Sequence, residues 1–289
     1  MTVTEKMTEI NTWWGRHRHS HDRFDLWSIG PVDLLCERRD NLWRLAWRHV
    51  HRAGSFPVRR AIGVTGAVSG FFDETSNEPN DTSFSALSRY YPAKSTLLTI
   101  PSMSPNEDLI FTPTYPAGPL RLALKTPTWL AAGERFNFGF LVPLSIQVEI
   151  APAHGGTRVV AEIPIHPMAK TWNGRDTTLG DLAFVPSPCL TVDRWVEHKP
   201  RLDYAACPIS LVNQSGSPKS IQNLVIPTVR LALYHSPQTG FWSDTLSFDI
   251  SESQPLKLEK AFPKDAGQPV LVQGPKQAPS TSAFHREHK

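Results

Sequence analysis

Proline is the feature of this sequence that most restricts how the chain folds. It occurs 26 times in 289 residues, about 9% where roughly 5% is usual, and it is spread along the whole chain. A proline inside a helix removes a hydrogen bond and costs about 3 kcal/mol. Hydrophobic residues make up 40% of the chain and charged residues 20%, which is typical of a protein with a packed core. The sequence therefore predicts a globular chain with almost no long helix.

Short apolar segments separated by turn residues predict strands along most of the chain. Three consecutive strands are expected at 24–30, 32–40 and 42–50, with Gly30-Pro31 and Asp40-Asn41 as turns. Comparable segments recur as far as residue 250 at intervals of about 8–12 residues, the spacing of a β-sandwich or barrel. The predicted fold is all-β, a β-sandwich that consists of one elaborated unit or two units, with a disordered C-terminal tail.

The segment 42–50 has two interpretations. As a strand it places Trp43, Leu45 and Trp47 on one face, whereas a helix also aligns Trp43 and Trp47 at the 3.6-residue period. We favour the strand, because tryptophan is enriched in strands and the short Asp40-Asn41 turn suits a hairpin.

Composition shifts along the chain predict its organisation. The expected parts are an N-terminal β-rich unit at 1–165, a linker or crossover at 166–181, a C-terminal β-rich unit at 182–262 and a disordered tail at 263–289.

Tryptophan and arginine are concentrated near the N-terminus. Residues 11–60 contain ten Arg, no Lys and five acidic residues, a net charge of about +5 for this segment. Arginine suits stacking on aromatic rings and bidentate pairing with carboxylates, and both residue types are enriched in protein interfaces. The alternative is that the rings fill the core, the arginine stems cover its rim and the guanidinium groups pair with acids such as Glu37 and Asp40. The predicted contact residues are Trp13, Trp14, Arg16, Arg18, Trp27, Trp43, Arg44, Trp47 and Arg48.

Three histidines alternate in this segment, at His17, His19 and His21. Alternate residues of a strand share one face, so the three rings are candidate ligands for a divalent metal. The neighbouring Arg16, Arg18 and Arg23 would repel such a cation, and a solvated basic strand is the favoured interpretation. Metal binding, or metal-dependent hydrolysis, is therefore only the alternative function.

Other catalytic patterns are weak. Cys36, Cys189 and Cys207 are far apart in the sequence and form no C-x-x-C pair, so they predict neither a disulfide framework nor a zinc site. Cys36 is expected to pack in the core. The sequence lacks the glycine-rich loops that bind nucleotide phosphates, and no acidic residue stands out as one of a catalytic pair.

Targeting and partner signals are also few. The N-terminus lacks the apolar core of a signal peptide, and the longest apolar stretch, 138–148, is too short to span a bilayer. We therefore expect a cytoplasmic location, no membrane insertion and no cofactor. The glycosylation sequons at Asn80 and Asn213 would matter only in a secreted protein. The expected partner is another protein or a second copy of the chain, with nucleic acid and carbohydrate less favoured.

Two stretches resemble a known family. LWSIGPVDLLCERRDNLWRLAW (26–47) and CPISLVNQSGSPKSIQNLVIPTVRLALYHSPQTGFWSD (207–244) are similar to a prokaryotic family of unknown function known mainly from archaea. The shared features are an opening pair of strands around Gly30-Pro31 and two late strands. This resemblance implies a β-rich, cytoplasmic accessory protein and no particular activity. From the residues together with this resemblance, we expect a non-enzymatic binding, scaffolding or accessory module.

Overall fold

The computed structural model is an all-β protein. Its helical content, within the part of the chain that is described, is limited to the 3-10 turn Thr228–Arg230 and a 3-10 residue at Ala266. That part includes no helix long and apolar enough to cross a membrane. The chain divides into two compact units, Met1–Thr112 with Ile146–His166 and Pro113–Ser145 with Pro167–Lys289. The structure describes residues 8–10, 12–18, 23–39, 41–50, 58–64, 95–104, 106–152, 156–174, 180–186, 191–192, 201–250, 256–262 and 266–276.

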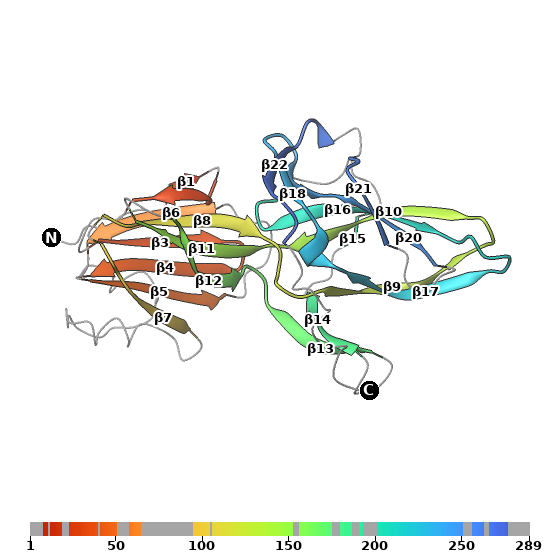
Figure 1. Ribbon diagram of the computed structural model, residues 1–289, viewed down its shortest axis with the longest axis horizontal. Coiled ribbons are helices and arrows are strands. Elements are labelled where there is room, and N and C mark those ends of the chain that lie inside the picture. The colour runs from red at the N-terminus through yellow and green to blue at the C-terminus, as the bar shows by residue number, and fades with distance from the viewer. Residues whose placement is uncertain are drawn as a thin grey trace, which may run out of the picture. The chain divides into compact units, whose positions relative to one another are not determined.

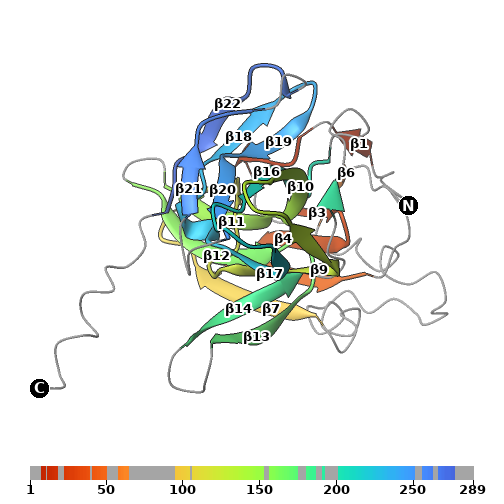
Figure 2. The same ribbon diagram turned by 90° about the vertical axis from the view of Figure 1, so that its right-hand side faces the viewer.

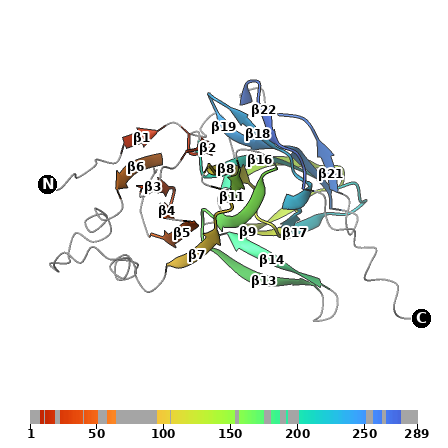
Figure 3. The same cartoon turned by 60° about the vertical axis from the view of Figure 1, so that its left-hand side comes forward.

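The first sheet of unit 1 has six strands in the order β1-β6-β3-β4-β5-β7, all paired antiparallel (Figure 1). Two residues separate β3 from β4, and two separate β4 from β5. Gly30 in the first turn has a φ of 55°, which glycine adopts without strain. Figure 3 shows β3, β4 and β5 side by side. The strands are β1 (Thr8–Ile10), β3 (Arg23–Ile29), β4 (Val32–Arg39), β5 (Leu42–His49), β6 (Val58–Val64) and β7 (Thr96–Pro101).

The second sheet of unit 1 has the order β12-β11-β8-β2. Its strands are β2 (Gly15–His17), β8 (Asp108–Thr114), β11 (Ser145–Ala151) and β12 (Arg158–Pro164). Alternation along β11 buries Ile146, Val148 and Ile150. The rings of Trp27 in the first sheet and Phe111 in the second are in contact, with centroids 5.5 Å apart. The two sheets thus enclose one core as a β-sandwich.

Unit 2 also consists of two sheets. The smaller has the order β13-β14-β9-β17, with β14 and β9 parallel. The larger follows β15-β10-β16-β19-β18-β22; in addition, β20 pairs with β16, and β21 pairs with β20. The smaller sheet contains β9 (Leu120–Leu130), β13 (Met168–Gly174), β14 (Gly180–Pro186) and β17 (Lys219–Ile226). The larger contains β10 (Arg135–Pro143), β15 (Thr191–Val192), β16 (Tyr204–Val212), β18 (Leu233–Ser236), β19 (Gly240–Ser243), β20 (Thr245–Asp249), β21 (Leu256–Glu259) and β22 (Val270–Gln273).

Asn213 holds together two turns of unit 2, at 131–134 and 213–218. Its fully buried side-chain Nδ2 donates to the carbonyl oxygens of Leu130, Ala131 and Ser217 at 2.9–3.0 Å. Its own backbone carbonyl accepts a hydrogen bond from the amide of Gly133 at 2.7 Å. One side chain therefore pairs backbone acceptors that the turns would otherwise leave buried and unpaired.

The predicted all-β fold is confirmed. The expected strands at 24–30, 32–40 and 42–50 correspond to β3, β4 and β5, and 42–50 is a strand rather than a helix. Within 166–181, for which the sequence predicts a linker or crossover, residues 168–174 form β13. The segment for which it predicts a tail contains β22, and residues 277–289 lie outside the described part of the chain.

Candidate functional site

Strand β2 carries the N-terminal tryptophan, arginine and histidine residues into unit 1. It pairs antiparallel with β8, with Arg16 opposite Ile110 and His17 opposite Leu109. Because side chains alternate along a strand, His17 points into the core and is only 9% exposed, whereas Arg16 and Arg18 are exposed. The His17 side chain is therefore buried in the sandwich, whereas Arg16 and Arg18 face solvent.

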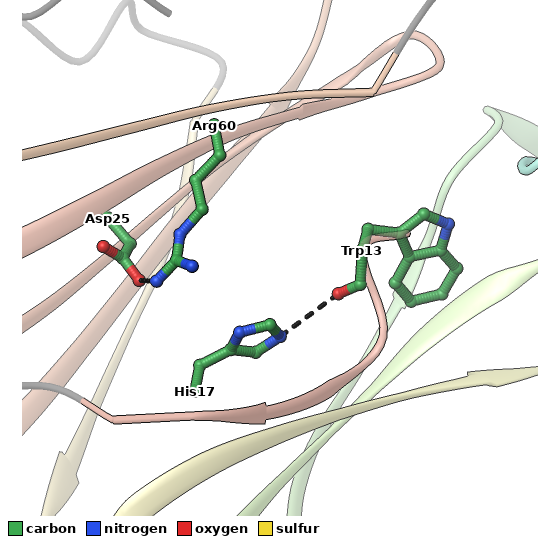
Figure 4. A network of polar contacts seen from close by, with 4 residues as sticks. All are labelled: Trp13, His17, Asp25 and Arg60. Atoms are coloured by element: carbon green, nitrogen blue, oxygen red, sulfur yellow. Dashed lines mark hydrogen bonds and ion pairs between the residues drawn. The ribbon is translucent and has the colours of Figure 1, made fainter. Parts of the chain in front are cut away.

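The His17 ring packs between two aromatic rings. Its centroid lies 4.6 Å from that of Trp27 and 4.8 Å from that of Phe111. Its Nε2 atom lies 3.2 Å from the backbone carbonyl oxygen of Trp13 (Figure 4), a hydrogen bond in the tautomer that protonates Nε2. These contacts hold the segment 13–17 against the core, and the His17 ring is itself part of the core packing.

An ion pair lies beside this histidine, on the same core face. Arg60 in β6 is opposite Trp27 in β3, and its guanidinium stacks over the indole at 4.6 Å. The same guanidinium donates to Asp25 Oδ2 at 2.6 Å (Figure 4). A buried carboxylate is tolerated when it is paired and hydrogen-bonded, so Arg60 stabilises Asp25 inside the sandwich.

Cys36 lies next to this ion pair, opposite Asp25 in the register of β3 and β4. Burial raises the pKa of its thiol well above the ordinary value of 9.0, and the negative charge of Asp25 raises it further, although Arg60 opposes the shift. Burial likewise raises the pKa of Cys207 in unit 2 to about 12. Both groups are neutral thiols near pH 7, which makes them poor nucleophiles. The expectation that Cys36 packs in the core is confirmed.

A second buried polar network surrounds Glu107. Its carboxylate accepts hydrogen bonds from Trp43 Nε1 at 3.1 Å, Ser102 Oγ at 2.7 Å and the Met103 amide at 2.8 Å. Arg38 donates to the Glu107 backbone carbonyl at 3.1 Å and stacks 5.2 Å from the Trp43 ring. The network ties β4 and β5 to the segment between β7 and β8.

The predicted contact residues separate into two groups. Trp13, Trp27 and Trp43 are buried in the core, as the alternative interpretation of the sequence describes, and Trp47 is partly buried. On the other face of the first sheet, Arg44 lies 3.9 Å from Glu37 and Arg48 lies 3.6 Å from Asp33. The residues that remain toward solvent are Trp14, Arg16 and Arg18, which we call the β2 surface.

The β2 surface continues onto the outer face of its sheet. Arg16 lies 3.7 Å from Asp108 of β8, and because the Arg16 side chain is mostly exposed to solvent, this contact contributes little stability. Further along this face, Glu149 accepts hydrogen bonds from Thr112 at 3.2 Å and Gln147 at 2.8 Å. This outer face is therefore polar.

Of the three alternating histidines, only His17 is among the described residues, and His19 and His21 lie outside them. Across the described residues, no group of three or more His, Cys, Asp or Glu side chains is arranged to hold a metal ion.

Sequence reasoning missed the contributions of Arg60 and Glu107. Arg60 and Asp25 are 35 residues apart, and Glu107 and Trp43 are 64 apart. No local spacing identifies such pairs. The excess of arginine over lysine was the available signal, since it is typical of stacked and paired guanidinium groups.

Comparison with known proteins places this β-sandwich chain in a family. The model of a family described as "Protein of unknown function (DUF432)" matches residues 13–286. The chain therefore belongs to this family, and the predicted similarity to a family of unknown function is confirmed. No curated protein matches the chain, and neither does any solved structure.

Proposed function

We propose that this protein is a non-enzymatic binding or accessory module that captures a protein partner along strand β2. The observation that carries the proposal is the position of β2 in its sheet. In the described sheet it pairs with β8 alone, and Trp14, Arg16 and Arg18 alternate with the buried Trp13 and His17. An edge strand offers backbone groups to an extended segment of a partner, and side chains beside it supply specificity.

The charge of the β2 surface indicates the kind of segment it accepts. Arg16 and Arg18 are both exposed, and Asp108 is the acidic group near Arg16. Two guanidinium groups on one side of a strand suit an extended segment that carries carboxylates, because arginine pairs with carboxylates bidentately. Trp14 adds a partly exposed ring of the kind that anchors protein interfaces.

A protein partner fits these charges better than a nucleic acid does. Nucleic-acid sites need a groove of cationic groups along the phosphate backbone. In this unit Arg44, Arg48 and Arg60 each lie within 4.0 Å of a carboxylate. Part of the positive charge that the sequence concentrates here is therefore neutralised within the fold, and the β2 surface carries two guanidinium groups beside the carboxylate of Asp108.

The buried thiols are consistent with a role that involves no nucleophilic chemistry. Cys36 and Cys207 are both fully enclosed, and burial raises the pKa of each. The Asp25–Arg60 pair and the His17 ring also contact core aromatic residues. We accordingly assign these groups to stability.

The proposal is tested by exchanging the charge of the β2 surface. Candidate partners captured from the source cell are purified, and their affinity is measured by fluorescence anisotropy for the wild-type chain and for Arg16→Glu/Arg18→Glu. We expect the double variant to bind at least about tenfold more weakly, since it places like charges against an acidic segment. Arg135→Glu, at an exposed position of β10 in unit 2, is the matched control and should leave the affinity unchanged.

Equal binding by wild type and the double variant would contradict the proposal. Binding to oligonucleotides that persists at about 200 mM salt and is lost in the double variant would assign the same surface to nucleic acid instead, because purely electrostatic association weakens steeply with salt.

A further inference from the structure

The first sheet of unit 1 is buried on both of its faces. Trp27 in β3 contacts the second sheet, and consecutive side chains of a strand point to opposite faces, so Leu26 points away from that sheet, to what we call the outer face. Leu26 lies beside Leu35 of β4, which lies beside Ala46 of β5. These three side chains and Phe24 are only 1–4% exposed. An antiparallel sheet with one solvated face would carry polar residues there, so the outer face is itself covered.

The path of the chain indicates which segment covers this face. Figure 2 shows β6 and β7 on opposite sides of β3 and β4. Each of the four steps from β6 through β3, β4 and β5 to β7 is antiparallel, so β6 and β7 run parallel to each other. Parallel strands of one sheet need a crossover that carries the chain back along the sheet. This crossover joins Val64 to Thr96, and the second sheet already occupies the inner face.

The crossover has the length and the composition that the outer face requires. Its two ends are separated by about 30 Å, from four inter-strand spacings and the length of a strand, whereas 30 residues can extend to about 100 Å. By contrast, the chain between β5 and β6 joins antiparallel strands and returns at the same end of the sheet. Residues 65–94 lie outside the described part of the chain, and their sequence contains seven large apolar or aromatic residues, Val68, Phe71, Phe72, Phe84, Leu87, Tyr90 and Tyr91.

We propose that residues 65–94 cover the outer face of the first sheet, so that β3 and β4 form the middle layer of unit 1. The apolar residues of this segment remove Phe24, Leu26 and Leu35 from water, a face that would otherwise be a large exposed apolar patch. A second copy of the chain is the other possible occupant. The crossover is favoured because it is attached to the same sheet at both ends, which gives it a far higher effective concentration than a separate molecule has.

The test places a photo-crosslinker at the margin of the outer face. Leu42 of β5 is half-buried and points to this face, because its neighbour Trp43 points to the inner one. A benzophenone maleimide is attached to Leu42→Cys in a Cys189→Ser background, since the other two cysteines are buried. After irradiation, the crosslinked peptides should include peptides from 65–94. Val159→Cys, on strand β12 of the second sheet, is the matched control and should give none from that segment. Crosslinks from Leu42→Cys that all fall outside 65–94, or that join two chains, would overturn the proposal.

A second experiment changes the chemistry of the crossover and keeps its length. Residues 65–94 are replaced by 30 residues of glycine and serine, and hydroxyl-radical oxidation of side chains is measured by mass spectrometry. Phe24 on the outer face should be oxidised several-fold faster than in wild type, whereas Trp27 should stay protected, because the second sheet covers it. The protection of Trp27 also reports that the variant is folded. Replacement of 277–289 in the same way is the control and should leave Phe24 protected. A folded 65–94 variant in which Phe24 stays protected would contradict the proposal.

Discussion

Glu107 illustrates how a single buried carboxylate organises several segments of unit 1. Burial by itself would raise its pKa, but hydrogen bonds from Ser102, the Met103 amide and Trp43 outweigh that effect, together with the positive charge of Arg38. The pKa of Glu107 consequently lies below its ordinary value of 4.5. The folded state therefore binds this proton less readily than the unfolded chain does.

This shift makes stability depend on pH. A carboxyl group whose pKa is lowered on folding stabilises the protein above its unfolded pKa, and the stabilisation is lost as the pH falls through the folded pKa. For Glu107→Gln we expect a loss of about 1–3 kcal/mol at pH 7, measured by urea unfolding. The difference from wild type should shrink as the pH falls below about 4.5. Glu134→Gln, at an exposed carboxylate, is the control, and a difference independent of pH would contradict this account.

At the scale of the secondary-structure elements, strand β2 is held by one inward side chain, His17. The strand has only three residues, and His17 is its inward anchor between Trp27 and Phe111. For His17→Ala we expect a loss of about 2–3 kcal/mol in the free energy of unfolding, from the cavity and the broken hydrogen bond. The matched variant Arg18→Ala removes an exposed neighbour and should change stability by less than about 0.5 kcal/mol. Equal effects in urea unfolding would show that His17 does not anchor the strand.

The strands were the features of this structure most readily predicted from the sequence. The turns at Gly30-Pro31 and Asp40-Asn41 delimit β3, β4 and β5 directly, because two-residue turns and alternating apolar residues are local signals. The inward orientation of His17 was not predictable in the same way. Strand alternation puts His17 and Arg16 on opposite faces, but only the surrounding Trp27 and Phe111 select the histidine for the core. That selection depends on contacts between segments far apart in the sequence.

At the scale of the whole molecule, the main feature is that the chain passes back and forth between its two units. Each unit is built from two separate segments, so the chain passes from one to the other after Thr112, Ser145 and His166. Sequence composition predicts units that are each one continuous segment. A change in composition marks a boundary along the chain, but it does not show that a later segment returns to the first unit. Strands β9 and β10, which lie between the segments of unit 1, pair with strands of unit 2.

This path predicts the behaviour of a fragment that ends at His166. Such a fragment retains β9 and β10 but lacks β14, β16 and β17, which are their partners. Unpaired apolar strands associate with one another, so we expect the fragment to form aggregates while the full chain remains dispersed. Size-exclusion chromatography and circular dichroism distinguish the two outcomes. A dispersed, cooperatively folding fragment would show that β9 and β10 do not require those partners.

The buried amide of Asn213 has a consequence for how the protein can be produced. Asn213 begins an N-x-S sequon, and its Nδ2, the atom to which an N-linked glycan is attached, donates to three backbone carbonyl oxygens inside the fold, which share its two hydrogens. A secretory expression host would encounter this sequon on the nascent chain before that amide is enclosed. Each chain modified there would lose the link between the two turns, so production in a compartment without glycosylation preserves the native fold.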